Sequence, residues 1–285
     1  MTISGSTTIS LGGLLTLNSV DGNGVLWRVN PDGFTGWGEP ASTLSPTQKP
    51  RQSGAWAGDA FNVFRTMTIA GTITAPSPSL LNSSIDNLLT AVTNAGFVLS
   101  VTENGFTRST TVRKQGETLT PKITNLIAAF SIQVVAVDPR KLGTPLTGVT
   151  LLPASTGGLV LPITVPFAIT STIVSGQVTL TNPGNEEGPV KLRIDGPCTG
   201  PVITHSGAVG SSLVFSSSLS LGVGEWLTID MDKRTALGND QASRSSYITS
   251  RGWSQFDPGV NVWAFAASAF NAASQLTVTA TPAWK

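Results

Sequence analysis

Hydrophobic and polar residues alternate along most of this chain, which is the pattern of β-strands that are buried on one face. In the first half, the alternation predicts strands over 25–29, 66–74 and 132–137. A turn-forming Asp-Gly-Asn-Gly run at 21–24 precedes the first of these strands. Residues 97–101 and 106–112 flank Glu-Asn-Gly and predict a hairpin.

One segment of the first half has helical spacing instead. Its apolar positions recur every three or four residues: Leu80, Leu81, Ile85, Leu88, Leu89 and Val92. Gly96 follows and predicts the C-terminal stop. We therefore expect a single amphipathic helix over about 79–95, packed on the strands.

The second half shows short strands separated by turns rich in Asn, Asp, Pro and Gly, with no helical period of useful length. The predicted strands cover 177–181, 190–194, 212–221, 226–231, 261–266 and 276–280. Evenly spaced strands joined by such turns are typical of an antiparallel β-sandwich. The fold class is therefore mainly β, with a β-rich N-terminal domain that carries one helix and a C-terminal sandwich.

A stretch rich in Gly, Pro, Thr and Ser separates the two halves, from 142 to 166. Such composition marks domain boundaries, and a chain of 285 residues is long enough for two cores. We place the boundary near Thr147, which gives domains at 1–147 and 148–285.

Charged residues make up 12% of the chain, against about 25% in an ordinary soluble domain. The net charge of +1 provides little repulsion between copies, so self-association is easier than in a highly charged protein. Nucleic-acid binding is not expected, because the densest basic stretch, 108–114, holds only Arg108, Arg113 and Lys114.

The sequence predicts neither secretion nor membrane insertion. No apolar run reaches the roughly 18 residues that a spanning helix needs, and residues 1–10 lack the features of a signal peptide. Cys198 is the single cysteine, so no internal disulfide can form. We expect the chain to stay in the cytoplasm until something other than secretion releases it.

Few residues could support catalysis. His205 is the single histidine, which excludes multi-histidine metal sites, and its surroundings indicate an exposed turn. Cys198 is expected to be small and structural. Asp230 and Asp232 share a strand face, but Lys233 and Arg234 follow at once, which favours a solvated strand edge over acid-base or calcium chemistry.

Another partial motif also fails. Asp21, Asn23 and Asp32 match three positions of a calcium loop, but Leu26 stands where that loop needs Gly. We assign no catalytic, cofactor-binding or metal-binding residue and expect no enzyme activity and no cofactor.

The seven tryptophans leave two interpretations open. Strand patterns contain Trp27, Trp226 and Trp263, which favours core positions, while loop tryptophans can anchor subunit interfaces: Trp37, Trp56, Trp253 and Trp284. An exposed Trp beside His, Arg or Asn on one strand face would instead indicate sugar binding. A carbohydrate-binding adhesin or lectin-like module therefore stays as the alternative function.

The order of parts resembles that of the distal tail proteins (Dit) of long-tailed, non-contractile bacteriophages, also called minor tail proteins. The likeness rests on Val-Asp-Pro-Arg-Lys at 137–141, Leu-Thr-Asn-Pro-Gly-Asn at 180–185, Gly-Glu-Trp-Leu-Thr-Ile-Asp at 224–230 and the segment 257–265. It covers nearly the whole chain and is stronger in the second half. The family has no catalytic residues to carry over.

The resemblance implies a function in the virion tail tip. It implies an N-terminal belt domain that forms a hexameric ring and a galectin-like C-terminal sandwich on the outside. The ring would join the tail tube protein to the tail hub or baseplate and its receptor-binding proteins. Exposed strand edges could pair across such a ring, and the strands around Arg108 and Val134 are our candidates for these edges.

Overall fold

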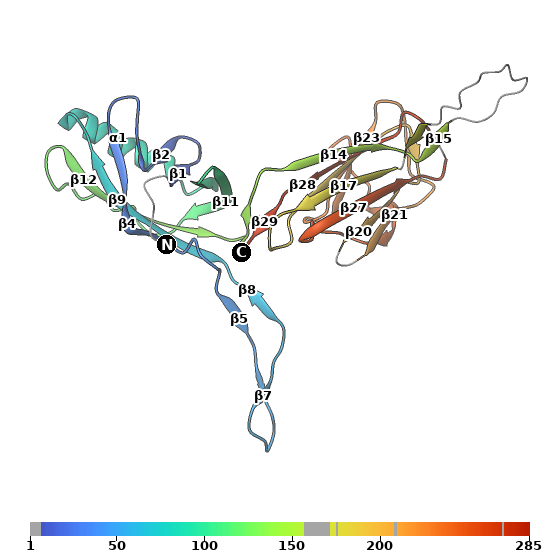
Figure 1. Cartoon of the computed structure of the whole chain (residues 1–285), viewed down its shortest axis with the longest axis horizontal. Helices are drawn as coiled ribbons and strands as arrows, with labels where there is room; N and C mark the ends of the chain where they lie inside the picture. The colour runs from blue at the N-terminus through green and yellow to red at the C-terminus, as the bar shows by residue number, and fades with distance from the viewer. Residues whose placement is uncertain (1–6, 157–171, 175, 208–209, 270) are drawn as a thin grey trace, which may run out of the picture. The chain divides into compact units, whose positions relative to one another are not determined.

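The structure is a computed structural model that describes residues 7–156, 172–174, 176–207, 210–269 and 271–285. Contacts divide the chain into an N-terminal unit, Met1–Gly143 with Lys285, and a C-terminal unit, Thr144–Trp284 (Figure 1). The sequence places the domain boundary near Thr147, and residues 157–166 of its boundary stretch lie outside the described residues. The predicted fold class is confirmed, because strands dominate both units and the described residues contain one α-helix.

An antiparallel sheet, in which the order of the strands differs from their order along the chain, forms most of the N-terminal unit. Its strands lie in the order β2 (Leu15–Leu17), β1 (Thr8–Leu11), β10 (Phe97–Glu103), β11 (Phe106–Lys114), β12 (Ile127–Ala136), β9 (Arg65–Thr74), β4 (Leu26–Thr35) and β3 (Ser19–Val20). The short strand β13 (Lys141–Leu142) also pairs with β11. Alternate residues of β9 and β12 are buried, as their sequence pattern predicts.

The strands around Arg108 and Val134 are not free edges, so that prediction is wrong. Val134 pairs with Met67 of β9 on one side and with Lys114 of β11 on the other. Arg108 pairs with Val101 of β10, and on its other side β11 pairs with β13 at Ser109 and with β12 at Arg113 and Lys114. Alternation shows that a strand is half-buried, but it does not show which strands lie next to it.

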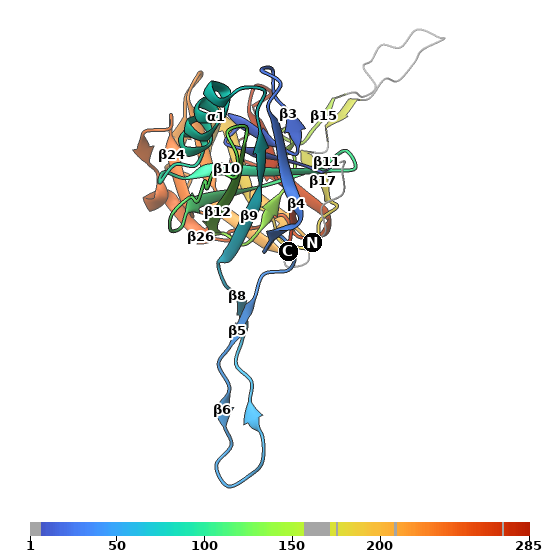
Figure 2. The ribbon, with the colours of Figure 1, turned by 90° about the vertical axis from the view of Figure 1, so that its left-hand side faces the viewer.

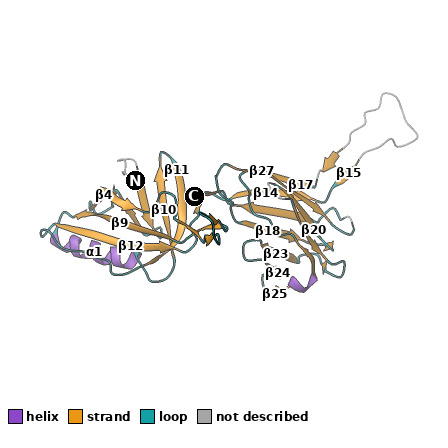
Figure 3. Ribbon diagram, turned by 90° about the horizontal axis from the view of Figure 1, so that it is seen from below, coloured by secondary structure: helices purple, strands orange, loops and turns teal. Residues whose placement is uncertain are grey.

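The helix α1 covers Pro78–Ala91 and packs on the sheet through Leu81, Ser84, Leu88 and Ala91 (Figure 3). The hydroxyl oxygen of Ser77 accepts a hydrogen bond from the Leu80 amide at 3.3 Å, and Pro78 suits the first turn. The helix ends short of the predicted residue 95. The β-branched Val92 and Thr93 and then Asn94 follow its last turn, and all three are weak helix formers.

Two antiparallel sheets form the sandwich of the C-terminal unit, with the core between them. One has the order β14 (Leu146–Leu151), β28 (Gln275–Ala280), β18 (Val190–Asp195), β23 (Trp226–Asp230), β24 (Thr235–Gly238) and β25 (Ala242–Ser243). The other has the order β17 (Gln177–Asn182), β27 (Gly259–Ala266), β20 (Val202–Ser206), β21 (Ser211–Phe215) and β26 (Ile248–Arg251). The two inner faces share one apolar cluster that includes Leu192, Leu227, Trp263 and Phe265.

The predicted strand 212–221 is two strands. After β21, a turn closed by the Leu219 amide and the Ser216 carbonyl, 2.9 Å apart, leads to β22 (Ser220–Leu221). That strand pairs with β19 (Cys198–Thr199), outside both large sheets. The smaller elements of this unit are β15 (Ala154–Thr156), β16 (Thr172–Val174), the 3-10 helix η1 (Ser245–Tyr247) and β29 (Ala283–Trp284).

Gly71 of β9 is required by close packing in the N-terminal core. It pairs with Phe130 and Val29 on the two neighbouring strands. A Cβ atom at Gly71 would lie 2.1 Å from the Arg28 carbonyl oxygen and 2.7 Å from the Phe130 ring. The missing side chain thus lets Phe130 lie beside Trp27, with ring centroids 6.4 Å apart.

We therefore expect Gly71→Ala to lower the free energy of unfolding by about 2 kcal/mol or more, because an added methyl group has no space. Chemical denaturation measures this change. Gly22→Ala is the control, since a Cβ there meets nothing within 4 Å, and it should change stability by less than about 0.5 kcal/mol. Equal effects at both positions would contradict this account of the packing.

Candidate assembly surface

A long hairpin projects from the sheet of the N-terminal unit (Figures 1 and 2). We call residues 41–62 the arm. It consists of two successive two-stranded ribbons, β5 (Ser42–Leu44) with β8 (Ala60–Asn62) and β6 (Thr47–Gln48) with β7 (Ala55–Trp56). All of its residues are exposed except the half-buried Lys49. The arm therefore has almost no packing against the described remainder of its own chain.

Large apolar side chains lie exposed on the arm. Leu44 is 50% exposed, Trp56 55% and Phe61 69%. Phe61 pairs with Thr43 whereas Leu44 pairs with Ala60, so Leu44 and Phe61 lie on opposite faces of the ribbon. An isolated two-stranded hairpin is marginal in water, and its outer edges carry unpaired backbone groups. Both faces of the arm are thus suited to a protein partner.

The tip of the arm is basic. The Lys49 amide donates to the Gly54 carbonyl at 3.1 Å and closes the turn, in which Arg51 has a left-handed φ of 61°. Lys49 and Arg51 are the charged residues of 41–58, a segment without Asp or Glu. Because the whole chain has few charges, two cations at one exposed tip favour contact with an acidic surface.

Two buried cations hold the root of the arm, and we call them the clamp. Arg65, only 2% exposed, follows the arm at the start of β9. Its Nη1 donates to the carbonyl oxygens of Gly36, at 3.0 Å, and of Gly38. Its Nη2 donates to the Pro139 carbonyl at 2.8 Å. One guanidinium therefore joins the segment that enters the arm to the strand that leaves it.

Lys141 is the second cation of the clamp and is 7% exposed. Its Nζ donates to the Trp37 carbonyl at 3.0 Å and to the Gly38 carbonyl at 3.3 Å, and it lies 5.5 Å from the centre of the Trp37 ring. Burial first, and then the nearby charges of Arg65 and Arg108, lower the pKa of Lys141 to about 8, while Glu103 opposes this shift. Burial likewise lowers the pKa of Arg65.

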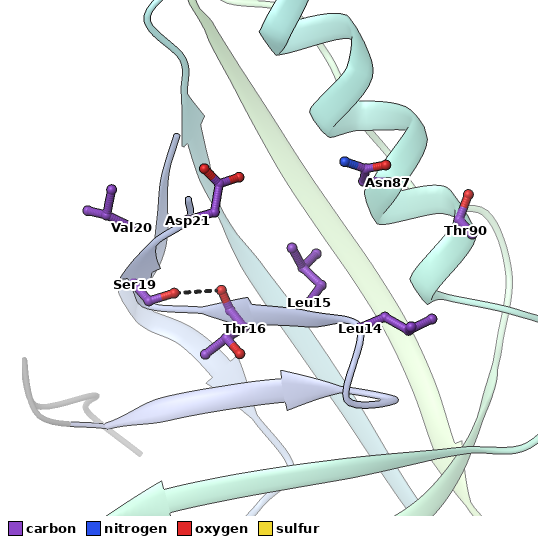
Figure 4. A pocket seen from close by; sticks show the side chains of 8 residues that line it. All are labelled: Leu14, Leu15, Thr16, Ser19, Val20, Asp21, Asn87 and Thr90. Atoms are coloured by element: carbon purple, nitrogen blue, oxygen red, sulfur yellow. Dashed lines mark hydrogen bonds between the residues drawn. The ribbon is translucent and has the colours of Figure 1, made fainter. Parts of the chain in front are cut away.

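A cavity of about 680 Å³ lies beside α1, between the helix and the strands β2 and β3 (Figure 4). It is lined by Leu14, Leu15, Thr16, Ser19, Val20, Asp21, Asn87 and Thr90. Leu14 is 74% exposed and Val20 62%. Asp21 is the one charged residue of this lining, so the cavity presents mixed polar and apolar surface with a single negative charge.

Asp21, the first residue of the partial calcium motif, is engaged by backbone amides of its own turn. Its Oδ1 accepts hydrogen bonds from the amides of Asn23 at 2.9 Å and Val25 at 3.0 Å. The carboxylate thereby holds the turn between β3 and β4. Within the described ranges, no three His, Cys, Asp or Glu side chains come together as a possible metal site.

His205 is not an exposed turn residue, so that prediction is wrong. It lies on β20 at 3% exposure, with its ring 4.9 Å from that of Trp263. Its Nε2 lies 2.9 Å from the Asn261 side-chain oxygen. That oxygen also accepts from the Asp257 amide, so Nε2 is the donor. Ile203 and His205 follow the strand alternation inward. Asn261 pairs with Nε2 of the ring, and the buried Nδ1 has no hydrogen-bond partner among the described residues.

Cys198 is buried as a small core residue, whereas the paired aspartates do not form the strand edge that we expected, because β23, which ends at Asp230, lies between β18 and β24. Cys198 is buried, and burial raises the pKa of its thiol to about 11, which makes it a poor nucleophile at neutral pH. Asp230 lies 3.8 Å from the Lys233 ammonium, and its Oδ1 accepts from the Lys233 amide at 3.0 Å. Asp232 follows the strand end and is exposed.

The tryptophans divide only partly as predicted, and the loop residues Trp253 and Trp284 are half-buried. Trp27 and Trp263 are fully buried and Trp56 is exposed, but the loop residue Trp37 is buried and Trp226 is half-buried. On the outer face of β18 and β23, the Arg193 guanidinium lies 4.6 Å from the centre of the Trp226 ring. This cluster satisfies itself, because Arg193 pairs with Asp195 at 2.7 Å and the indole N–H donates to Asp240 at 3.1 Å.

Because Lys141 of the clamp is buried, we expect its contribution to the stability of the protein to depend on pH. The pKa of a lysine in an unfolded chain is about 10.4, whereas the pKa of Lys141 in the folded chain is about 8. Between these values the unfolded chain binds more protons, so the contribution of Lys141 to stability rises with pH. We expect the stability of the wild type, measured relative to Lys141→Met by urea denaturation, to rise from pH 8 to 10.5 and to be constant below pH 7. A difference that does not vary with pH would contradict the shifted pKa.

Sequence comparisons identify no relative: no protein-family model matches the chain, and no curated protein matches it. Among the described residues, no helix has the length and apolar character needed to span a bilayer.

Solved structures do match. The Dit protein of phage SPP1, described as a paradigm of the hub adsorption apparatus in phages that infect Gram-positive bacteria, aligns with a TM-score of 0.66 at 10% identity, over 98% of this chain and 99% of that one. Chains of the activated phage p2 baseplate, with calcium or strontium, give TM-scores of 0.49 and 0.47 at 11% and 12% identity, over 96% and 93% of this chain and 97% and 99% of theirs. The first of these likenesses shows that the chain has the fold of a Dit protein along nearly its whole length.

Proposed function

We propose that this chain is a non-enzymatic structural subunit of a bacteriophage tail tip, a distal tail protein of the virion. The Dit fold over nearly the full length supports the proposal, together with the order of the Dit-like sequence motifs. The single histidine, His205, is buried, and its Nε2 is hydrogen-bonded to Asn261, which supports a structural rather than a catalytic function. The solvent-exposed arm is the observation that carries the assembly part of the proposal.

Copies of the chain assemble into a ring through the arm. The arm and the cavity beside α1 are different surfaces of the same unit, so an arm that occupies the cavity of the next copy forms a heterologous contact. Contacts of this kind close into a ring when the rotation between copies permits. The resemblance to Dit gives six copies, with the tail tube protein on one side and the hub and receptor-binding proteins as further partners.

The arm and the cavity are complementary in chemistry. The exposed Trp56 and Phe61 bring apolar surface, and the cavity offers the exposed Leu14 and Val20. Burial of such large side chains at the centre of an interface supplies much of the binding free energy in many complexes. The basic tip of the arm then meets an acidic region, which includes Asp21 in the cavity wall and the exposed Asp86 of α1.

We expect Trp56→Ser to raise the dissociation constant of the oligomer about tenfold or more, because loss of an interface aromatic anchor costs about 2 kcal/mol. Sedimentation velocity over a range of concentrations, with light scattering, gives the mass of the assembly. Val223→Ser is the control, since Val223 is 87% exposed in the C-terminal unit, and it should assemble as the wild type does. If the Trp56 variant assembled as tightly as the wild type, the proposed contact through the arm would be wrong.

A mixing experiment tests whether the contact is heterologous. The Leu14→Asp variant has an intact arm and a damaged cavity, whereas Trp56→Ser has the reverse. At a concentration near the dissociation constant of the wild type, each variant alone should stay largely monomeric. A mixture should stop at heterodimers, because each mixed pair contains one intact arm and one intact cavity. Rings formed by either variant alone, or no heterodimer in the mixture, would count against arm-in-cavity assembly.

A further inference from the structure

A second cavity, of about 410 Å³, lies in the C-terminal unit where β26 and η1 meet the turn before β24. It is lined by Arg234, Ser245, Ile248, Arg251 and Trp253. This lining combines two guanidinium groups, one hydroxyl group and one indole, and it contains no carboxylate. We propose that the cavity binds an anionic saccharide, a sugar or polyol unit that carries a phosphate or a carboxylate group. The proposal concerns the C-terminal unit alone and does not depend on ring assembly.

A β-bulge directs two of the lining residues into the same space. In a regular strand, Ile248 and Arg251 would point to opposite faces, because they are three residues apart. Here the pairing with β21 shifts: Val214 pairs with Ser250, but the next residue, Phe215, pairs with Ile248. Thr249 is the extra residue. Bulges of this kind redirect side chains and are common at edge strands and next to sites, and β26 is an edge strand.

Arg234 reaches the cavity from an unusual backbone conformation. Its φ of 55° lies in the left-handed region, which costs a non-glycine residue about 1 kcal/mol. The adjacent Lys233 is held away from the cavity, since its ammonium group and its amide both contact Asp230. The turn thus neutralises Lys233 and presents Arg234 to the cavity. The bulge and this turn are two separate departures from regular geometry that serve one lining.

No described residue pairs with the two guanidinium groups of the cavity. In the part of the chain that the structure describes, neither Arg234 nor Arg251 has a side-chain hydrogen bond or an ion pair. Two like charges that share a cavity favour an anion between them, and the planar guanidinium group matches a phosphate or carboxylate with two parallel hydrogen bonds. The cluster around Trp226 differs in this respect, since its arginine, Arg193, already forms an ion pair with Asp195.

The remaining lining residues indicate that the ligand is larger than a simple inorganic anion. Trp253 is half-buried and lies two residues after Arg251, where it supplies an aromatic wall. Aromatic surface of this kind packs against the apolar C–H face of a sugar ring. The Ser245 oxygen accepts from the Ser243 hydroxyl at 3.3 Å, which leaves its own O–H free to donate. The volume lies within the range of about 300–1,000 Å³ typical of small-ligand sites.

The test is a titration of the full chain, and of its Trp56→Ser variant, with four probes: glucose 6-phosphate, glucuronate, glucose and inorganic phosphate. The indole N–H resonance of Trp253, assigned with Trp253→Phe, reports binding. We expect both charged sugars to shift it, glucose to leave it unchanged at the same concentration, and inorganic phosphate to bind more weakly than glucose 6-phosphate. Arg234→Gln and Arg251→Gln should each weaken binding about tenfold or more, because each removes a charge-assisted hydrogen bond.

Lys191→Gln is the matched control, because it removes one exposed cation from the outer face of β18. It should bind like the wild type. The proposal is overturned if glucose binds as tightly as glucose 6-phosphate, if inorganic phosphate does so, or if the Lys191 variant loses as much affinity as the arginine variants. It is also overturned if neither charged sugar shifts the resonance. Use of the Trp56→Ser background keeps each of these outcomes separate from the fate of the ring.

Discussion

The clamp of Arg65 and Lys141 is the interaction on which the arm depends. Both cations donate to the Gly38 carbonyl, and Arg65 also reaches Pro139, so one buried cluster fixes where the chain leaves the sheet and where it returns. Carbonyl dipoles replace water around two charges, while burial and the neighbouring charges of Arg65 and Arg108 lower the pKa of Lys141. An arm with little packing of its own can hold a direction because its root is fixed in this way.

The clamp also explains why glycines lie where the chain enters the arm. Gly36 has a φ of 82°, and a Cβ atom there would lie 2.0 Å from the Thr66 carbonyl oxygen. Only glycine lets the backbone of 36–38 pass close enough to β9 for its carbonyl oxygens to face the guanidinium of Arg65. The arm is thus specified by three local features together: permissive glycines before it, a buried arginine after it and exposed apolar residues along it.

Sequence alone predicted the fold class, the helix and most long strands, because each depends on local periodicity. It missed the arm, since residues 41–62 lack regular alternation and contain Pro46 and Pro50. It placed His205 on the surface, because a polar residue near a turn gives no sign that Asn261, 56 positions away, will satisfy it. The proposed saccharide cavity was equally hidden: Arg234 and Arg251 come from separate turns and strands, and a bulge brings Ile248 into line. Trp56 and Trp253 were the available signals, as tryptophans outside strand patterns.

The low fraction of charged residues in the chain determines which partners both proposed surfaces favour. In a chain with 12% charged residues, most of the surface provides weak long-range fields, so the few concentrated charges decide which partners are favoured. The arm tip carries two cations beside apolar anchors, which suits a contact with a protein surface. The second cavity carries two cations beside an indole and a hydroxyl group, which suits a small anion with a sugar face. Because each surface is confined to one unit with its own core, assembly and ligand binding can change independently, and a substitution in one lining should leave the other intact.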